Sequence, residues 1–131
     1  MFQARKSVHR TISMKKILII EDEQDIVDIA TMILEDEGYE VCSMTEFDGY
    51  ESKVEKCHAD LVLLDLNLGA YHGKDICKYI KGQDDLKKIA VVLMSANKDI
   101  EIVKNEAGAD AFISKPFDLE HFIQVIRTQI A

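Results

Sequence analysis

Four short apolar stretches of the chain end in a polar side chain that is able to do chemistry. The clearest is the unbroken apolar run at residues 61–64, which Asp65 follows directly. A run of this kind is typical of a strand buried on both faces of a parallel sheet. Asp65 would then lie at the carboxyl end of the strand, where open α/β sheets bind ligands. Alone, an aspartate here could equally be a simple strand terminus, because Asp is common in turns.

The other three apolar stretches lie at residues 17–20, 90–94 and 111–114. The polar residues that follow or end them are Glu21 and Asp22, Ser95, and Lys115. Each has an ordinary explanation by itself, such as an acidic first turn of a helix or a solvated lysine. Because the carboxyl ends of parallel strands meet at one edge of a sheet, we expect all of them to lie near Asp65.

Three carboxylates brought together at one edge would repel one another and raise each other's pKa. A divalent cation relieves that repulsion, and Mg²⁺ prefers oxygen ligands of this kind. We therefore predict a Mg²⁺ site. Asp22 and Asp65 would be direct ligands, Glu21 would bind directly or through a water, and Asn67 would contribute its backbone carbonyl.

A carboxylate beside such a metal can act as a covalent nucleophile toward phosphorus. Phosphoryl transfer depends mainly on positioning and on neutralising charge at the phosphoryl oxygens. Asp65 would be the acceptor, the Lys115 ammonium would pair with one phosphoryl oxygen, and the Ser95 hydroxyl would donate a hydrogen bond to another. The sequence therefore predicts phosphoryl transfer to Asp65.

The rest of the chain supplies the elements that would position these residues. Apolar residues recur at helical spacing after each strand, and a weaker strand is expected at residues 39–44. The first helix would start with Asp22 as its N-cap and stop at Gly38. Four more helices are expected within residues 47–57, 76–82, 100–108 and 118–130. Five alternating strand–helix units predict a parallel sheet with helices on both faces.

The length and composition exclude several classes of protein. A chain of 131 residues forms one domain, and a net charge of −8 argues against a nucleic-acid surface. The apolar runs are too short to span a membrane. The three cysteines, Cys42, Cys57 and Cys77, are odd in number and lack the spacing of a metal site, so we expect reduced thiols in a cytoplasmic protein.

The first residues differ in composition from the remainder. Residues 1–16 hold five of the 16 basic residues and none of the 24 acidic ones, and they lack the apolar stretch of a secretory signal. We expect a flexible extension at residues 1–14 and a folded domain at 15–131. Met14, followed by two lysines, looks like a natural beginning.

Residues 16–130 resemble the receiver domain of two-component response regulators. Residues 17–23 resemble the first strand and acidic pair of that family, and residues 108–117 resemble its last strand and lysine. Asp65 matches its phospho-acceptor, and Ser95 matches the position where it has a hydroxyl residue. The resemblance implies a flavodoxin-like (βα)5 fold, a doubly wound parallel five-stranded sheet with strand order 2-1-3-4-5. It also implies a cis peptide bond between Lys115 and Pro116.

The resemblance further implies a signalling switch. A sensor histidine kinase or phosphotransfer protein would donate a phosphoryl group from a phosphohistidine to Asp65. Ser95 and Phe112 would be the switch residues. Partner binding would change at a face formed by residues 98–107, the strand around Phe112 and the helix from Asp118, and a homodimer could form through it. The only reactions would be self-phosphorylation and self-dephosphorylation, so the chain is not expected to be an enzyme. The cognate kinase and target are not implied.

Three positions depart from the family pattern. Glu21 stands where Asp is commoner, Gly69 where Pro is frequent, and Phe112 where many members have Tyr.

Three other functions fit the sequence less well than a receiver domain. An aspartate-nucleophile phosphohydrolase would need an acidic residue at Asn67. A flavin-binding electron carrier would need a Gly-rich loop in place of the acidic residues after the first strand. A phosphorylation-independent interaction module would not need the complete set of acidic, hydroxyl and lysine residues.

Overall fold

The computed structural model describes residues 14–130, which form a three-layer α/β structure. Its centre is a five-stranded sheet in which all neighbouring strands are parallel and the order is β2-β1-β3-β6-β7. The strands are β1 (Lys16–Ile20), β2 (Glu40–Met44), β3 (Leu61–Asp65), β6 (Ala90–Ser95) and β7 (Ala111–Ser114). Counted among the five sheet strands, this is the order 2-1-3-4-5, so the flavodoxin-like prediction is confirmed.

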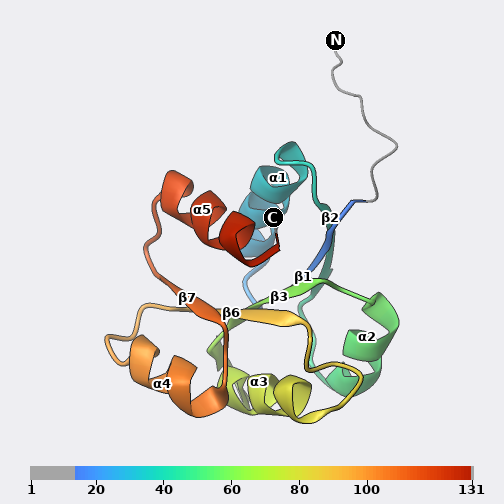
Figure 1. Ribbon diagram of the computed structural model, residues 1–131. Coiled ribbons are helices and arrows are strands. Elements are labelled where there is room, and N and C mark those ends of the chain that lie inside the picture. Colours follow the sequence, from blue (N-terminus) through green and yellow to red (C-terminus); the bar gives the residue numbers. More distant parts are fainter. Residues whose placement is uncertain (1–13, 131) are drawn as a thin grey trace.

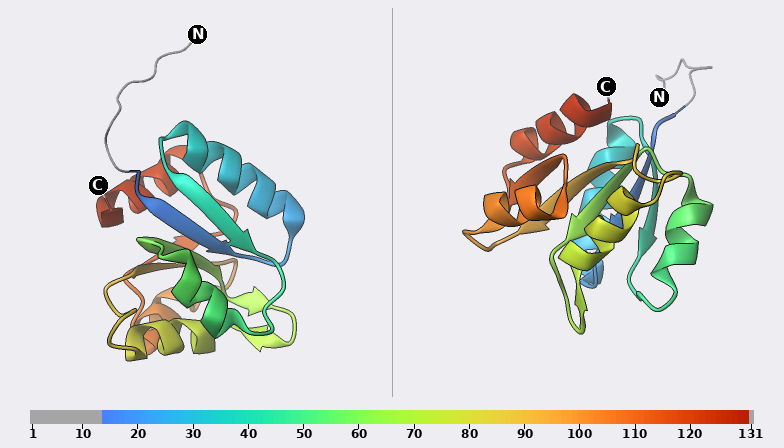
Figure 2. Two further views of the ribbon diagram at one scale, coloured as in Figure 1. Left: turned by 90° about the vertical axis from the view of Figure 1, so that its right-hand side faces the viewer. Right: turned by 60° about the horizontal axis from the view of Figure 1, so that its bottom comes forward.

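Helices cover both faces of the sheet. They are α1 (Gln24–Asp36), α2 (Tyr50–Cys57), α3 (Gly73–Gly82), α4 (Ile100–Ala107) and α5 (Leu119–Ile130). Helices α1 and α5 lie on one face, and α2, α3 and α4 lie on the other (Figures 1 and 2). The expected cap of α5 is present, since Asp118 accepts a hydrogen bond from the His121 N–H at 3.0 Å.

The two faces of the sheet explain the continuous apolar runs in the sequence. Along β1, Ile17 and Ile19 pack under α1 and α5, whereas Leu18 and Ile20 pack under α2 and α3. All five residues of β3 are buried. A strand covered on both sides needs apolar residues at every position, which is why alternation is absent. The buried runs therefore end where the sheet ends, and the polar residues begin at its edge.

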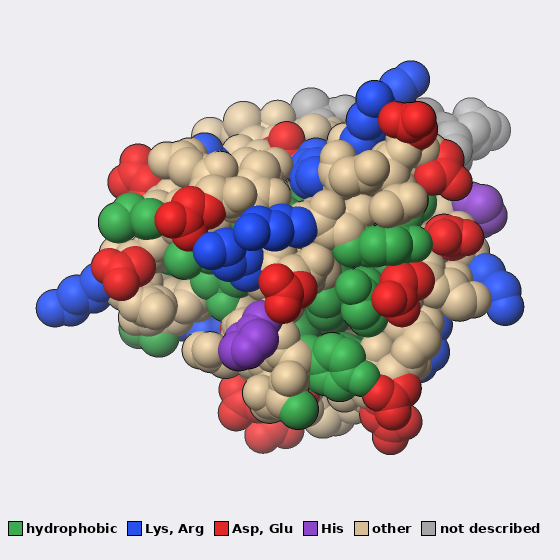
Figure 3. All heavy atoms as spheres, turned by 90° about the horizontal axis from the view of Figure 1, so that it is seen from below, with side chains coloured by type: hydrophobic (Ala, Val, Ile, Leu, Met, Phe, Trp, Pro, Cys, Tyr) green, Lys and Arg blue, Asp and Glu red, His purple; other side chains and the backbone are tan. Residues whose placement is uncertain are grey.

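The surface over α2, α3 and α4 is mixed in charge. Acidic and basic side chains are interspersed there, and a band of hydrophobic side chains remains visible between them (Figure 3). Lys74 of α3 pairs with Glu106 of α4 at 2.7 Å, and Lys81 pairs with Asp110 at 2.7 Å. Exposed pairs of this kind contribute little individually, roughly 0–1 kcal/mol each. The first pair joins α3 to α4, and the second joins α3 to the connection between α4 and β7.

A short hairpin follows Asp65. Strands β4 (Asn67–Leu68) and β5 (Tyr71–His72) pair antiparallel, and Gly69 in the turn has a φ of +66°. The Tyr71 ring packs edge-on against Phe47 with centroids 5.8 Å apart, and its hydroxyl donates to the Asp48 carboxylate. Two-residue strands are too short to show a periodicity, so no pattern could predict them. The hairpin is tied to the connection between β2 and α2.

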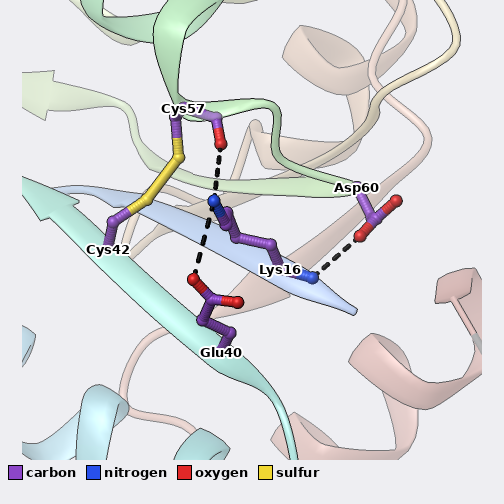
Figure 4. Close-up of a disulfide and its surroundings, with 5 residues drawn as sticks. All are labelled: Lys16, Glu40, Cys42, Cys57 and Asp60. Atoms are coloured by element: carbon purple, nitrogen blue, oxygen red, sulfur yellow. Dashed lines mark hydrogen bonds and ion pairs between the residues drawn. A yellow bond between two sulfur atoms is a disulfide. The ribbon is translucent and has the colours of Figure 1, made fainter. Parts of the chain in front are cut away.

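The expectation of three free thiols is wrong for two of them. Cys42 of β2 and Cys57 of α2 are joined as a disulfide (Figure 4). Cys77 of α3 is a buried free thiol whose Sγ lies 3.5 Å from the Ala107 carbonyl. The pairing brings together cysteines that are 15 residues apart, a proximity that only the fold creates.

The Lys115–Pro116 peptide bond is cis, as the resemblance implied. Residues 1–13, which make up nearly all of the expected extension, lie outside the described residues. Within residues 14–130, no helix has both the length and the apolar character needed to cross a membrane.

Candidate functional site

A pocket of about 480 Å³ opens at the carboxyl edge of the sheet. Its walls come from the ends of β1, β3, β6 and β7 and from the hairpin. The lining residues are Asp22, Glu23, Asp65, Asn67, Gly69, Ala96 and Lys115. The pocket therefore contains residues from four separate parts of the chain, as the topology argument predicted.

Asp65 stands at the end of β3 and is 4% exposed. The neighbouring backbone holds it in place, because the Leu66 N–H donates to the Met94 carbonyl at 3.0 Å and the Asn67 N–H donates to Asp65 Oδ1 at 3.4 Å. Gly73, at the start of α3, packs directly against this segment. A Cβ atom at position 73 would collide with the Asp65 carbonyl oxygen and the Leu66 Cα. Only glycine allows α3 to approach so closely.

Glu21 follows β1 and is completely buried. Its N–H donates to the Met44 carbonyl at 3.2 Å, and its Oε2 accepts a hydrogen bond from the Glu23 N–H at 3.2 Å. Burial, together with the negative charge of Asp65, raises the pKa of Glu21 to about 7. This carboxyl group therefore holds a proton more strongly than an exposed glutamate does.

Asp22 is exposed and is not the N-cap of α1. The cap position belongs to Glu23, which makes no side-chain capping hydrogen bond. The prediction of an Asp22 cap is therefore wrong by one residue. The Asp22 carboxylate instead lies in a group with those of Glu21 and Asp65, and the three offer oxygen atoms within 4.8 Å of one another.

Lys115 follows β7 and supplies the positive charge of the site. Its Nζ lies 3.3 Å from Glu21 Oε1 and 3.4 Å from Asp65 Oδ1. Burial of the ammonium opposes its charge, but the carboxylates of Asp65 and Glu21 outweigh that effect and raise the pKa of Lys115. The lysine is therefore held between the two buried acids in its charged form.

The donor set fits a divalent cation. When ionised, the carboxylates of Glu21, Asp22 and Asp65 carry three negative charges, and one ammonium contacts two of them. The remaining charge matches that of a divalent ion, and carboxylate oxygens are the ligands that Mg²⁺ prefers. Asn67, the fourth predicted ligand residue, also lines the pocket.

The two predicted switch residues lie farther from the pocket. Ser95 is 1% exposed, and its Oγ accepts a hydrogen bond from the Asn97 N–H at 2.9 Å. Its neighbour Ala96, rather than Ser95, lines the pocket. Phe112 lies beside Leu93 in the sheet and is partly buried against the core on the face of α2, α3 and α4. The Phe112 ring therefore already contacts the core.

The sequence analysis assigned no role in the site to Gly69 or Gly73. Gly69 brings the hairpin turn to the pocket wall, and Gly73 permits the close approach of α3 to Asp65. Both glycines are visible in the sequence, but the backbone contact that requires Gly73 exists only after the chain has folded. By contrast, Glu21, Asp22, Asp65, Asn67 and Lys115 are brought together as predicted.

The fold and the acidic pocket define a class of doubly wound α/β proteins with a carboxylate-rich site at the strand ends. The family model for the response regulator receiver domain matches residues 17–127. The chain belongs to that family.

Individual relatives agree with this membership. The chain is 36% identical over 116 residues to the response regulator ArlR of Staphylococcus aureus, covering 87% of this chain and 52% of that protein. It is 32% identical over 114 residues to the sensory transduction protein RegX3 of Mycobacterium tuberculosis, covering 87% and 50%. The chain thus spans about half the length of these relatives. A CheY-like receiver domain from Methanospirillum hungatei matches with a TM-score of 0.79 and 28% identity, covering 88% of this chain and 93% of that one.

Proposed function

We propose that the chain is a signalling switch in which the Asp65 carboxylate accepts a phosphoryl group from a phosphohistidine. The donor would be a sensor histidine kinase or a phosphotransfer protein, acting in the cytoplasm. The main support for the proposal is the geometry at Asp65. Its nearly buried carboxylate lies 3.4 Å from the Lys115 ammonium and close to two further carboxylates. Membership of the receiver family supports the same reading.

In the proposed reaction, a carboxylate oxygen of Asp65 forms a bond to phosphorus as the bond to the histidine nitrogen breaks. The electron pair of that bond returns to the imidazole. Lys115, already held beside Asp65, would pair with a phosphoryl oxygen. Ser95 can still donate its hydroxyl proton, because its Oγ is an acceptor in the bond from Asn97. These groups would stabilise the charge of the phosphoryl oxygens.

Asp22, Asp65 and the backbone carbonyl of Asn67 would hold Mg²⁺, with Glu21 binding directly or through a water. When bound, the ion supplies positive charge to the oxygens of the transferred group. Glu21 would lose its proton on binding, because its raised pKa reflects burial and repulsion that a cation relieves.

The chemistry is confined to Asp65, so we do not propose an enzyme that acts on a separate substrate. An aspartate-based phosphohydrolase would need an acid/base group where Asn67 stands, and an amide cannot serve that purpose. Self-phosphorylation from small donors and self-dephosphorylation remain part of the proposal. The output would be a change in partner binding or homodimerisation at the face of α4, β7 and α5.

Acetyl phosphate tests the acceptor directly. With Mg²⁺ present, the intact mass should rise by one phosphoryl group, and chelation of the metal should prevent the rise. Asp65→Asn should remain unmodified, whereas Glu23→Gln, an acidic neighbour outside the carboxylate cluster, should be labelled like the wild type. Undiminished labelling of Asp65→Asn would show that Asp65 is not the acceptor.

A further inference from the structure

The two bridged cysteines lie in a second pocket, separate from the acidic site. Cys42 is on the edge strand β2, and Cys57 is the last residue of α2. Both are partly exposed, and both line a surface pocket of about 330 Å³. Among the residues that the structure describes, none lines both this pocket and the acidic one. The pair is therefore accessible to a small molecule without any change at Asp65.

Lysines give this pocket a positive character, although the chain as a whole has a net charge of −8. Lys16, Lys53 and Lys56 line it, and no carboxylate within residues 14–130 does. Lys16 Nζ donates to the Cys57 carbonyl at 3.0 Å and pairs with Glu40 at 3.6 Å (Figure 4). Lys53 Nζ donates to the Glu46 carbonyl at 3.4 Å, so its charge is not neutralised there. Nearby ammonium groups favour thiolates and attract anions.

Cys77 provides a contrast within the same chain. It is 0% exposed, and burial raises the pKa of its thiol to about 11. Buried thiols in apolar surroundings are unreactive, because the thiolate is the nucleophile. Reactivity toward a disulfide in solution should therefore be confined to Cys42 and Cys57.

The bridge lies at the surface, where both sulfur atoms can be approached from the pocket that Cys42 and Cys57 line. We propose that Cys42 and Cys57 form a thiol–disulfide exchange site for a small anionic disulfide such as oxidised glutathione. The carboxylates of that ligand match the charges of Lys53 and Lys56, whereas Lys16 already pairs with Glu40.

The exchange balances in two steps. The thiolate of one cysteine attacks a sulfur of the small disulfide, which forms a mixed disulfide and releases one thiolate that takes up a proton. The thiolate of the other cysteine then attacks the protein sulfur of the mixed disulfide and releases the second small thiol. Two protein thiols are oxidised to one disulfide, and one small disulfide is reduced to two thiols. A reducing dithiol reverses both steps, and the bridge alternately ties the end of α2 to β2 and releases it.

Oxidised glutathione, added to the fully reduced chain, tests the proposal. Wild type should lose two hydrogen atoms in intact mass, and peptide mapping should recover a Cys42–Cys57 crosslink. Cys42→Ser and Cys57→Ser should each stop at one glutathione adduct, because the second thiol is missing. Cys77→Ser should behave like the wild type. Asp65→Asn should also react normally, which separates this site from the phosphoryl chemistry.

Two substitutions test the role of the lysines. Lys53→Gln combined with Lys56→Gln should slow the reaction with oxidised glutathione roughly threefold or more, while the rate with the neutral 2-hydroxyethyl disulfide should change less. Adducts on Cys77 in the folded protein, crosslinks only between two chains, or failure of folded wild type to react would each overturn the proposal. Equal slowing with both disulfides would contradict the proposal that the ligand is anionic.

Discussion

Glu21 is buried beside a second carboxylate, and this sets how the stability of the metal-free protein depends on pH. Its pKa is near 4.5 when exposed and about 7 in the folded chain. Between these values the folded state holds a proton that the unfolded state has lost, so stability falls as pH rises. The contribution is fully present below about pH 4.5 and lost above about pH 7.

Glu21→Gln removes this titration, because glutamine resembles the protonated acid. The free energy of unfolding of the variant, minus that of the wild type, should rise between pH 4.5 and pH 8 by on the order of 3 kcal/mol. Urea unfolding without divalent metal, at several pH values, measures the difference. A difference that stays constant with pH would mean that Glu21 ionises normally.

Asp22 and Glu23 are adjacent acids that occupy different positions in the structure. The Asp22 carboxylate belongs to the cluster with Glu21 and Asp65, whereas Glu23 caps the start of α1 through its backbone. Asp22→Ala should therefore weaken Mg²⁺ binding about tenfold or more, and Glu23→Ala much less. An NMR titration followed at the Asn67 amide measures both affinities. Equal losses of Mg²⁺ affinity in the two variants would mean that the acidic residues only mark the start of α1.

Strand β3 and helix α3 together hold Asp65, the proposed acceptor, in place. Gly73 lets the first turn of α3 contact the Asp65–Leu66 backbone, and backbone atoms cannot move aside as a flexible side chain can. Gly73→Ala should destabilise the fold by about 1–3 kcal/mol and slow labelling of Asp65.

Gly82 provides a matched control at the other end of α3. A Cβ atom there would meet nothing within 4 Å, so Gly82→Ala should be neutral or slightly stabilising. Thermal unfolding and the rate of labelling by acetyl phosphate compare the two variants. If Gly73→Ala matched Gly82→Ala in both measurements, the close approach of α3 would not matter.

The sheet strands could be predicted from the sequence, whereas the hairpin and the N-cap of α1 could not. The strands could be predicted because burial on both faces requires unbroken apolar runs, and five alternating units then predict a parallel sheet. The strand order was implied only by the family resemblance. The hairpin of β4 and β5 could not be predicted, because strands of two residues carry no periodicity. Asp65 and Lys115 could be placed because each follows a strand. The N-cap of α1 could not, because it depends on the backbone geometry, and the cap is Glu23 rather than the predicted Asp22.

For the whole molecule, the acidic site and the cysteine pair differ in what the sequence can reveal. The acidic residues are recognisable because each follows a strand, and the strands converge on one edge. Cys42 and Cys57 meet because an edge strand passes the end of α2, which no local pattern signals. The molecule therefore carries one site that topology predicts and one that only packing creates.

The proposed transmission from Asp65 to the face of α4, β7 and α5 would involve the whole molecule. A phosphoryl group on Asp65 offers acceptor oxygens to Ser95 and Lys115, at the ends of β6 and β7. A movement of Ser95 must break its hydrogen bond from Asn97 and shift the connection to α4. Phe112, partly buried beside Leu93, could then pack more deeply and bias a two-state element.

The most direct test uses beryllofluoride, which stands in for the phosphoryl group without turnover. Its addition with Mg²⁺ should shift the amide signals of Ser95, Ala96, Phe112 and Lys115 together, with effects reaching α4. Asp65→Asn should show none of these shifts, and Ser95→Ala should lose most of those in α4 and at Phe112. Shifts that survive in Ser95→Ala, or that concentrate on α1, would contradict a switch that runs from Asp65 through Ser95 to the α4, β7 and α5 face.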